Sequence, residues 1–254
     1  MRVESGAVTD VGRKRQRNED FFVSDDDLGL FVVIDGMGGH AHGNVASRLL
    51  GERIREFVAA TALDPHKTWP FEFDPRLSHA ANRLKASVAV ANRELAREMD
   101  KDTRLRGMGA TMTGALVDGG RVAISNVGDC RTYLVRDGAI RQVTSDHSWV
   151  AEQVRHGIIG QADAKRHPLR NLVTRAVSGG ERLEVDVLEL PLLSGDLLLL
   201  CSDGLHGLVG DEDLLQTVMA NAGDPLAACQ SLIALANLRG APDNVTAVVV
   251  VVSE

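Results

Sequence analysis

Apolar positions along the chain follow two periods, one typical of helices and one typical of strands. Two pairs of helices are predicted where apolar residues recur every three to four positions, over 42–61 with 75–102 and over 211–222 with 225–239. Helix pairs separated by blocks of antiparallel strands favour an α+β fold, with sheets packed together and helices outside. Short apolar or alternating runs predict the strands, over 3–9, 21–23, 28–34, 110–117, 121–127, 131–135, 139–143, 172–177, 183–190, 197–201 and 245–252.

Two segments interrupt this pattern. Residues 62–74 contain Pro65, Trp69 and Pro70 and are predicted to form a connecting loop. Residues 146–171 mix helical and irregular features, and they interrupt the series of strands without a strong core pattern. We therefore expect residues 1–254 to form a single domain that carries a flap subdomain at about 146–171.

Three acidic residues stand at the ends of apolar runs. Asp35 ends one run and Asp203 ends another, each followed by a glycine, and Asp243 directly precedes the last run. Taken alone, an Asp-Gly pair after a strand is typical of a turn whose carboxylate caps the next helix. The end of one antiparallel strand lies beside the start of its neighbour, so Asp203 and Asp243 can meet at one sheet edge. Asp35 can then approach them from an adjacent sheet.

The chemistry of such a cluster points to a metal. A buried carboxylate needs a cation or a hydrogen-bond donor to offset the loss of its hydration. Oxygen ligands without His or Cys are the set that Mg²⁺ or Mn²⁺ prefers, rather than Zn²⁺. The three acids therefore predict a magnesium or manganese site, and ligand type does not distinguish these two metals.

Composition narrows the class of protein. The formal net charge of −7 argues against a nucleic-acid groove, which needs clustered excess positive charge. The N-terminal residues lack the apolar core of a signal peptide, and the C-terminal apolar run is too short to span a bilayer. No CxxC spacing occurs, so free thiols in a reducing cytoplasm are expected for the cysteines, which are Cys130, Cys201 and Cys229.

A basic cluster occupies residues 13–17, directly before the acidic pair Glu19 and Asp20. One interpretation is a solvated loop. A second is a nucleic-acid or import patch. A third is a cation placed beside an anion that the metals bind.

Short motifs that occur in order along the chain resemble those of one family. They are Thr9–Asp20, Asp35–His40, Gly109–Thr113, Val127–Arg131, Ser145–Ser148, Ser202–Leu205 and Asp243–Thr246. Each motif alone is weakly specific, whereas the ordered set is very specific and covers nearly the whole chain. The set resembles the bacterial branch of the PP2C (PPM) metal-dependent protein serine/threonine phosphatases.

The resemblance implies a fold and a metal site. The fold is a four-layer α-β-β-α sandwich, in which two antiparallel sheets are flanked by pairs of helices. The site holds two Mn²⁺ or Mg²⁺ ions at one edge. Asp35 is implied to bridge both metals, and the carbonyl of Gly36 to bind one of them. Asp203 and Asp243 are implied to complete the ligands of the other metal.

The resemblance also implies a reaction. Arg15 would hold the substrate phosphate, while Glu19 and Asp20 would orient waters bound to the metals. Two metals about 3.5 to 4 Å apart lower the pKa of a shared water and clamp an in-line displacement. The expected reaction is hydrolysis of phosphoserine or phosphothreonine by direct attack of that water or hydroxide, without a phosphoenzyme. The cysteines carry no nucleophile signature, which agrees with this expectation.

The chain departs from the family pattern in two places. Met37 stands where eukaryotic members have a His that is proposed as general acid. His40 is a candidate substitute, with a helix-start or packing role as the alternative, and a metal-bound water or another residue can also supply that proton. Bacterial relatives hold a third metal partly through an Asp before the Gly-x-Thr motif, but residues 105–108 contain no acid here. A third site is therefore expected to be weak or absent, unless Asp102 reaches in from a shifted loop.

Two other functions remain compatible with the sequence. One is a non-catalytic phosphoprotein-binding regulatory module of the same fold, and the other is a metal-dependent nuclease or small phosphoester hydrolase. The expected partners are phosphorylated proteins, with a cognate Ser/Thr kinase or its substrates among the candidates. A monomer without nucleic acid or a membrane span is expected.

Overall fold

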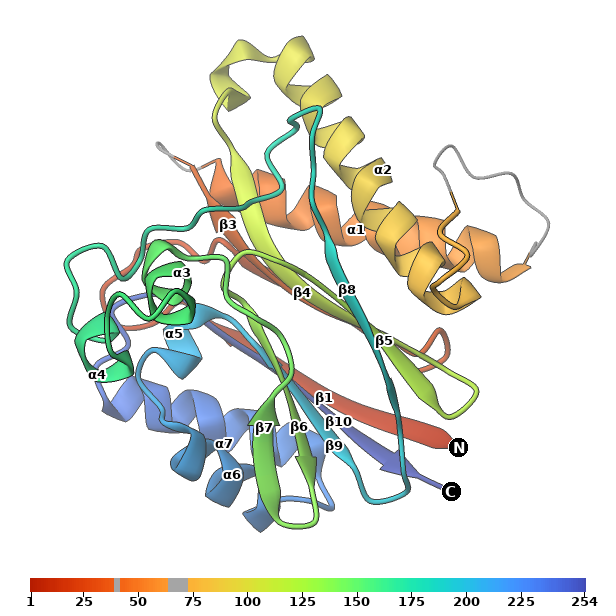
Figure 1. The fold of residues 1–254 in the computed structure, drawn as a ribbon, viewed down its shortest axis with the longest axis vertical. Helices are drawn as coiled ribbons and strands as arrows, with labels where there is room; N and C mark the ends of the chain where they lie inside the picture. Colours follow the sequence, from red (N-terminus) through yellow and green to blue (C-terminus); the bar gives the residue numbers. More distant parts are fainter. Residues whose placement is uncertain (39–41, 64–72) are drawn as a thin grey trace.

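Two antiparallel sheets of five strands each pack face to face, and helices cover the outer face of each sheet (Figure 1). The computed structural model describes residues 1–38, 42–63 and 73–254. The order of layers is helices, sheet, sheet, helices. This arrangement confirms the four-layer α+β sandwich that the sequence predicts.

The first sheet has the strand order β2-β3-β4-β5-β8, and each neighbouring pair is antiparallel. Strand β3 is apolar along most of its length because both of its faces are buried: Val32 packs on the helix side and Val33 on the other sheet. The strands are β2 (Asp20–Asp25), β3 (Leu30–Met37), β4 (Gly109–Asp118), β5 (Arg121–Val127) and β8 (Asp186–Pro191).

The second sheet has the strand order β1-β10-β9-β6-β7 and is also antiparallel. Strand β10 is also buried on both faces: Val248 faces the first sheet, and Val249 faces the helices. The strands are β1 (Arg2–Asp10), β6 (Arg131–Arg136), β7 (Ala139–Gln142), β9 (Leu197–Cys201) and β10 (Val245–Ser253).

Two helix pairs complete the sandwich. Helices α1 and α2 pack on the first sheet, and α6 and α7 pack on the second (Figure 1). Across the described ranges, no helix combines the length and the apolar character that crossing a bilayer requires. The helices are α1 (Gly43–Leu63), α2 (His79–Lys101), the 3₁₀ helix η1 (Thr103–Leu105), α3 (Trp149–Arg155), α4 (Gln161–Ala164), α5 (Asp203–His206), α6 (Asp211–Ala220) and α7 (Pro225–Leu238).

The strand register places the predicted acids at one end of the sandwich. Strands β9 and β10 are antiparallel, with Cys201 opposite Ala247. Asp203, just after β9, and Asp243, just before β10, therefore lie at the same edge. In the first sheet, Asp20 of β2 lies directly opposite Asp35 of β3.

One predicted strand is wrong. Residues 172–177 form only isolated bridges, in which Val173 pairs with Ser148 and Val177 with Ala110. Leu172 is exposed and Val177 is buried in the core, so the segment meets its neighbours at single points and not along a continuous strand. The following strand, β8, begins at Asp186 rather than at residue 183.

Two other boundaries differ from the predictions. Helix α2 begins at His79 rather than at residue 75, because the Oγ of Ser78 accepts a hydrogen bond from the backbone N–H of Ala81 and caps the helix. Of the predicted loop 62–74, residues 64–72 lie outside the described residues, and residues 62–63 belong to α1.

Candidate metal centre

The three acids that end apolar runs come together as the sequence predicts. The carboxyl group of Asp203, at the start of α5, lies within hydrogen-bond reach of that of Asp35, at the end of β3. Asp243 is close enough to raise the pKa of both. The centre lies beside α5 in Figure 1, where the two sheets meet at their strand ends.

Burial and mutual repulsion act on this cluster together. The pKa of Asp35 is well above its ordinary value, first because of burial and then because of the charges of Asp20 and Asp203. The pKa of Asp203 is raised by burial and by Asp243. These carboxylates therefore resist ionising at the same time unless a cation joins them.

Asp20 is held in place and is still not satisfied. Its Oδ2 accepts hydrogen bonds from Ser202 Oγ (2.8 Å) and Thr246 Oγ1 (2.6 Å). Burial nevertheless raises the pKa of Asp20 to about 7. Among the described residues, no donor reaches the buried Oδ1 of Asp20 or the buried Oδ1 of Asp203. Buried carboxylate oxygens usually accept a hydrogen bond. Two that lack a donor at one centre are therefore what we expect of oxygens that bind a cation.

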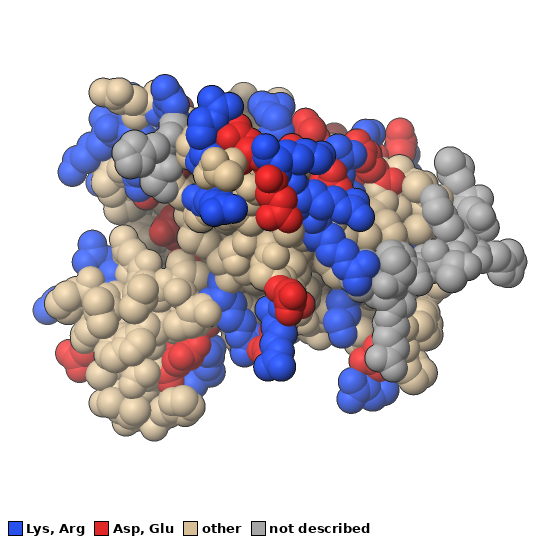
Figure 2. Space-filling model, turned by 90° about the horizontal axis from the view of Figure 1, so that it is seen from above, with Lys and Arg blue, Asp and Glu red and all other residues tan. Residues whose placement is uncertain are grey.

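These residues fit divalent cations. Oxygen donors surround the centre, and neither His nor Cys takes part among the residues above. Across the described part of the chain, no three acidic, His or Cys side chains are already arranged around one point at ligand distances. In the described structure Asp243 is paired with Arg15. Figure 2 shows a hollow at one side of the molecule with acidic atoms at its floor and Lys and Arg atoms on its rim.

The glycine after Asp35 is required by close packing. A Cβ atom on Gly36 would lie 2.1 Å from the carbonyl oxygen of Gly43 and 2.6 Å from that of Glu19. A Cβ on Gly43 would in turn lie 2.7 Å from both the Gly36 carbonyl oxygen and Glu19 Oε2. The carbonyl of Gly36 and the carboxylate of Glu19 therefore flank the same small space.

Arg15 stands at the rim of the centre. Its Nη2 donates to Asp243 Oδ2 (2.7 Å), and this hydrogen bond is the main reason that the pKa of Arg15 is raised. Glu19 and Asp35 add to the effect. The Arg15 side chain is 54% exposed, so its guanidinium faces both the acids and the solvent.

Asn244 connects the parts of the centre, and its role was not predicted. Its Oδ1 accepts from the backbone N–H of Glu19 (2.8 Å), and its Nδ2 donates to the carbonyls of Val11 (3.0 Å) and Arg17 (2.9 Å). One buried amide thus fixes both ends of the Arg15 loop beside Asp243. The sequence signal was its place directly after a predicted ligand.

Asp129 is a further acid of the cluster. The nearby guanidinium of Arg131 forms a bidentate pair with Asp146 (2.9 and 2.7 Å), so Asp129 does not share that ion pair. Burial, and then the charge of Asp203, raises the pKa of Asp129 to about 7. Asp129 therefore extends the acidic centre on the Asp203 side.

Two histidines hold the turn that carries Asp129. His147 Nδ1 accepts from the backbone N–H of Gly128 (3.0 Å), and its Nε2 donates to Asp186 Oδ2 (3.0 Å). Burial lowers the pKa of His206 to about 4, so it is neutral and its Nε2–H donates to the Asp129 carbonyl (2.9 Å).

The sequence offered two further candidates for catalysis or metal binding. His40 lies outside the described residues. Asp102 caps η1 and forms a bidentate pair with Arg104, which lowers its pKa to about 2. The carboxylate of Asp102 is therefore paired at the surface in the described structure, and its role as a metal ligand stays an untested alternative to a weak or absent third site.

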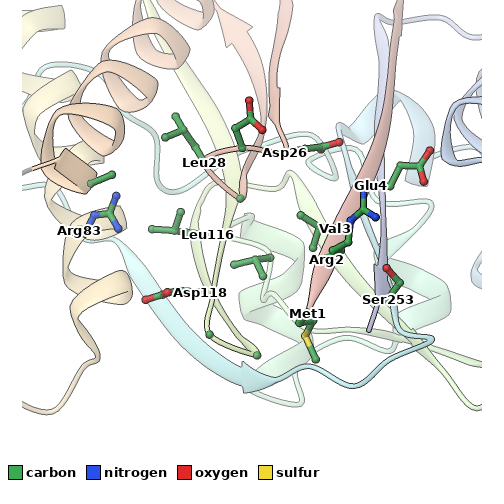
Figure 3. A pocket seen from close by; sticks show the side chains of 16 residues that line it. Met1, Arg2, Val3, Glu4, Asp26, Leu28, Arg83, Leu116, Asp118 and Ser253 are labelled. Carbon is green, nitrogen blue, oxygen red and sulfur yellow. The ribbon is translucent and has the colours of Figure 1, made fainter.

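A second hollow, of about 930 Å³, lies at the opposite end of the strands (Figure 3). Met1, Asp26 and Asp118 line it together with Arg83. The Arg83 guanidinium donates to the carbonyl of Val58 (2.8 Å) and to Thr61 Oγ1 (3.2 Å). These hydrogen bonds satisfy acceptors near the C-terminal end of α1. The acidic residues that line this hollow are exposed, whereas burial raises the pKa of Asp35, and we therefore place the chemistry at the acids around Asp35.

A two-sheet sandwich with an acidic centre of this kind at its strand ends defines a class of metal-dependent phosphatases. Residues 11–238 match the family described as Protein phosphatase 2C. The chain belongs to this family, as the sequence motifs predicted. It is accordingly a protein serine/threonine phosphatase, a hydrolase of phosphoric monoesters.

Individual relatives agree with this assignment. The chain is 34% identical over 249 residues to the serine/threonine phosphatase stp of Listeria monocytogenes, covering 95% of this chain and 93% of the relative. The crystal structure of the Mycobacterium tuberculosis phosphatase PstP/Ppp is 34% identical, with a TM-score of 0.86 and full coverage of both chains. The PstP catalytic domain in complex with two manganese ions is 33% identical, with a TM-score of 0.83, covering 100% of this chain and 99% of that domain.

Proposed function

We propose that this chain hydrolyses phosphoserine and phosphothreonine in proteins with two Mn²⁺ or Mg²⁺ ions. Asp35, the Gly36 carbonyl, Asp203 and Asp243 would hold these ions. When bound, the ions would supply a water of lowered pKa and positive charge that stabilises the phosphoryl group in the transition state. The structure of a relative with two manganese ions supports this proposal.

The observation that carries the proposal is the uncompensated charge of the acids. Asp35 and Asp203 have raised pKa values, and one oxygen each of Asp203 and Asp20 lacks a donor among the described residues. A protein rarely buries such a group without a cation to meet it. The complete ligand set also argues for turnover rather than for a binding module that has lost its catalysis.

Each remaining residue of the centre has a role in this proposal. Arg15 would leave its ion pair with Asp243 and bind the phosphate, since its planar fork of donors suits phosphoryl oxygens. Glu19, whose backbone is fixed by Asn244, and Asp20, fixed by Ser202, would orient water at the centre. Asp129 would add an oxygen donor on the Asp203 side. The leaving-group proton is assigned to no described residue, and His40 is its candidate from the sequence.

The segment 146–171 is proposed to act as a flap beside the centre. The pair of Arg131 with Asp146 anchors its first residue (2.7 Å). Trp149 stacks on His167 with ring centroids 4.8 Å apart, which joins its two short helices into one unit. Figure 1 shows α3 and α4 on the same side of the molecule as α5, whose first residue belongs to the centre.

The proposed setting follows from the same observations. The substrates are phosphorylated proteins, and a cognate Ser/Thr kinase is the proposed source of their phosphates. The free cysteines are buried, which is compatible with a reducing cytoplasm. A monomer is proposed.

The direct test is release of phosphate from a phosphothreonine peptide in the presence of Mn²⁺. Replacing Asp35 by Asn should lower the rate by at least about 10²-fold to 10³-fold, because a charge that holds the metals is lost. The matched control is Asp27→Asn, an exposed turn acid of the same β2–β3 hairpin, which should keep the wild-type rate. Equal rates for wild type and Asp35→Asn would refute the proposal, and peptide binding without hydrolysis would indicate the non-catalytic module.

A further inference from the structure

The proposed reaction uses only one cation of the basic cluster 13–17. Lys and Arg number 28 in 254 residues, and four of them fall in these five positions. Arg15 already has a role at the metal centre, where it is proposed to bind the phosphate. We define the other three, Arg13, Lys14 and Arg17, as the basic rim.

The backbone that carries the basic rim is fixed beside the metal centre. The N–H of Arg13 donates to the carbonyl of Ala241 (2.8 Å), and Asn244 holds the carbonyl of Arg17 (2.9 Å). Gly12 has a φ of 78°, and a Cβ there would lie 2.1 Å from the carbonyl oxygen of Asp243. The backbone of the loop is therefore packed against the residues that precede β10. The Cα atoms that carry the basic rim are fixed relative to the metal centre.

The side chains of the basic rim are exposed and have no anionic partner. All three residues are exposed, and within the described part of the chain their side chains make no hydrogen bond or ion pair. Arg104 and Arg136, by contrast, are each paired with an aspartate. In a chain with a net charge of −7, this loop is a local cluster of positive charge next to Arg15 and its partner Asp243.

The distances suit the residues that flank a phosphorylated side chain. Consecutive Cα atoms are about 3.8 Å apart, so the three Cα atoms of the basic rim lie within about 8 Å of that of Arg15. An extended peptide advances about 3.3 Å per residue. An anionic group up to about three residues from a phosphate on Arg15 can therefore come within about one Debye length of the basic rim when the peptide runs along the loop 13–17.

We propose that the basic rim is a substrate subsite that selects phosphoprotein segments with carboxylates or a second phosphate next to the phosphorylated residue. This inference rests on the proposed function and names the substrate class of the same site. The rim acts by charge and leaves the chemistry at the metals unchanged.

A polynucleotide is a poorer match for the same cations. Polynucleotide binding depends on a continuous positive track along the phosphate backbone, whereas the chain as a whole carries a net charge of −7. Aromatic residues make up only 4% of the chain, so stacking platforms for bases are scarce. A short acidic peptide segment can place its charges on the rim alone.

The test compares phosphothreonine peptides that share one core sequence. One has alanine at the flanking positions, the second has glutamate there, and the third has a second phosphothreonine two residues away. We expect wild-type enzyme with Mn²⁺ to prefer the acidic peptides by about tenfold in kcat/KM at low salt, since three exposed charge pairs contribute a factor of about two each. The preference should shrink at high salt.

The decisive variant is Arg13→Gln/Lys14→Gln/Arg17→Gln. It should hydrolyse the alanine peptide at the wild-type rate and lose the preference for the acidic peptides. The matched control is Arg2→Gln/Arg121→Gln/Arg141→Gln, which removes the same charge from exposed positions at the far ends of β1 and β5 and on β7. This control should keep the preference.

Each contrary outcome overturns a defined statement. A preference that survives in the rim variant, or that is lost equally in the control, refutes the subsite. A single-stranded oligonucleotide that inhibits through the rim more strongly than the glutamate peptide refutes the assigned substrate class. Wild-type enzyme that hydrolyses none of the three peptides refutes the proposed function and, with it, the subsite.

Discussion

At the scale of single residues, Asp203 shows how one side chain can oppose stability and support function. Its carboxylate is buried beside Asp35 and Asp243, and its Oδ1 has no donor among the described residues. Asp203→Asn removes one of the repelling charges. We expect a higher melting temperature in EDTA, weaker Mn²⁺ binding by calorimetry, and a rate lower by about 10²-fold or more.

The matched control for this prediction is Asp118→Asn, at the exposed end of β4, which should change none of the three quantities. If Asp203→Asn melted at a lower temperature than wild type in EDTA, the carboxylate would be stabilised by its neighbours. The repulsion described above would then be refuted.

Sequence reasoning found the residues whose position in the pattern was unusual. Asp35, Asp203 and Asp243 were predicted because acids stand at the ends of apolar strands. Asn244 and His206 were not, since their roles depend on hydrogen bonds to backbone atoms distant in sequence, such as the carbonyl of Asp129. A hydrogen bond between residues distant in sequence leaves no local pattern from which it could be predicted.

At the scale of elements, the turn between β5 and β6 depends on the histidines that hold it. His147→Ala leaves the buried N–H of Gly128 without its acceptor, which costs about 1 to 3 kcal/mol of unfolding free energy. We expect that loss in urea unfolding, together with weaker Mn²⁺ binding because Asp129 is no longer positioned. His147→Asn, whose Oδ1 can accept the same bond, should recover part of both.

This prediction has a clear contrary result. If His147→Ala lost stability while Mn²⁺ affinity and kcat stayed at wild-type values, the turn would be structural only, and the positioning of Asp129 would be refuted. Exposed His156, at the end of α3, offers the matched control His156→Ala, which should change neither quantity.

The elements themselves were predicted where burial is regular. Strands β3 and β10 are buried on both faces, and α2 buries one face along its whole length, so each leaves a strong apolar pattern. The predicted strand 172–177 failed because it pairs with its neighbours only at isolated bridges and not along a continuous ladder. Such a segment is defined by isolated contacts, in which Val177 pairs with Ala110, and these leave no period in the sequence.

At the scale of the whole molecule, the acidic centre couples stability to pH. The pKa values of Asp20 and Asp129 are raised to about 7, first by burial. In the unfolded chain an aspartate titrates near about 3.9. Between these values the folded protein holds protons that the unfolded chain has released, so the free energy of unfolding falls as pH rises from about 4 to about 7.

We therefore expect the metal-free protein to melt at a higher temperature near pH 5 than near pH 7.5, by several degrees, since about 1 kcal/mol corresponds to about 2 to 4 °C for a chain of this size. Mn²⁺ binds the ionised carboxylates and should remove this loss at the higher pH. Thermal melts in EDTA and in Mn²⁺ across this range provide the measurement. Metal-free stability that rises with pH over the same window would contradict the assignment.

The burial of the thiols affects how the protein responds to oxidants. Cys130, Cys201 and Cys229 are enclosed by the cores, and burial raises the pKa of the latter two to about 12. Peroxide attacks thiolates that solvent can reach, and here it finds none. We therefore expect this chain to keep its phosphatase activity at peroxide concentrations that inactivate enzymes with a catalytic cysteine.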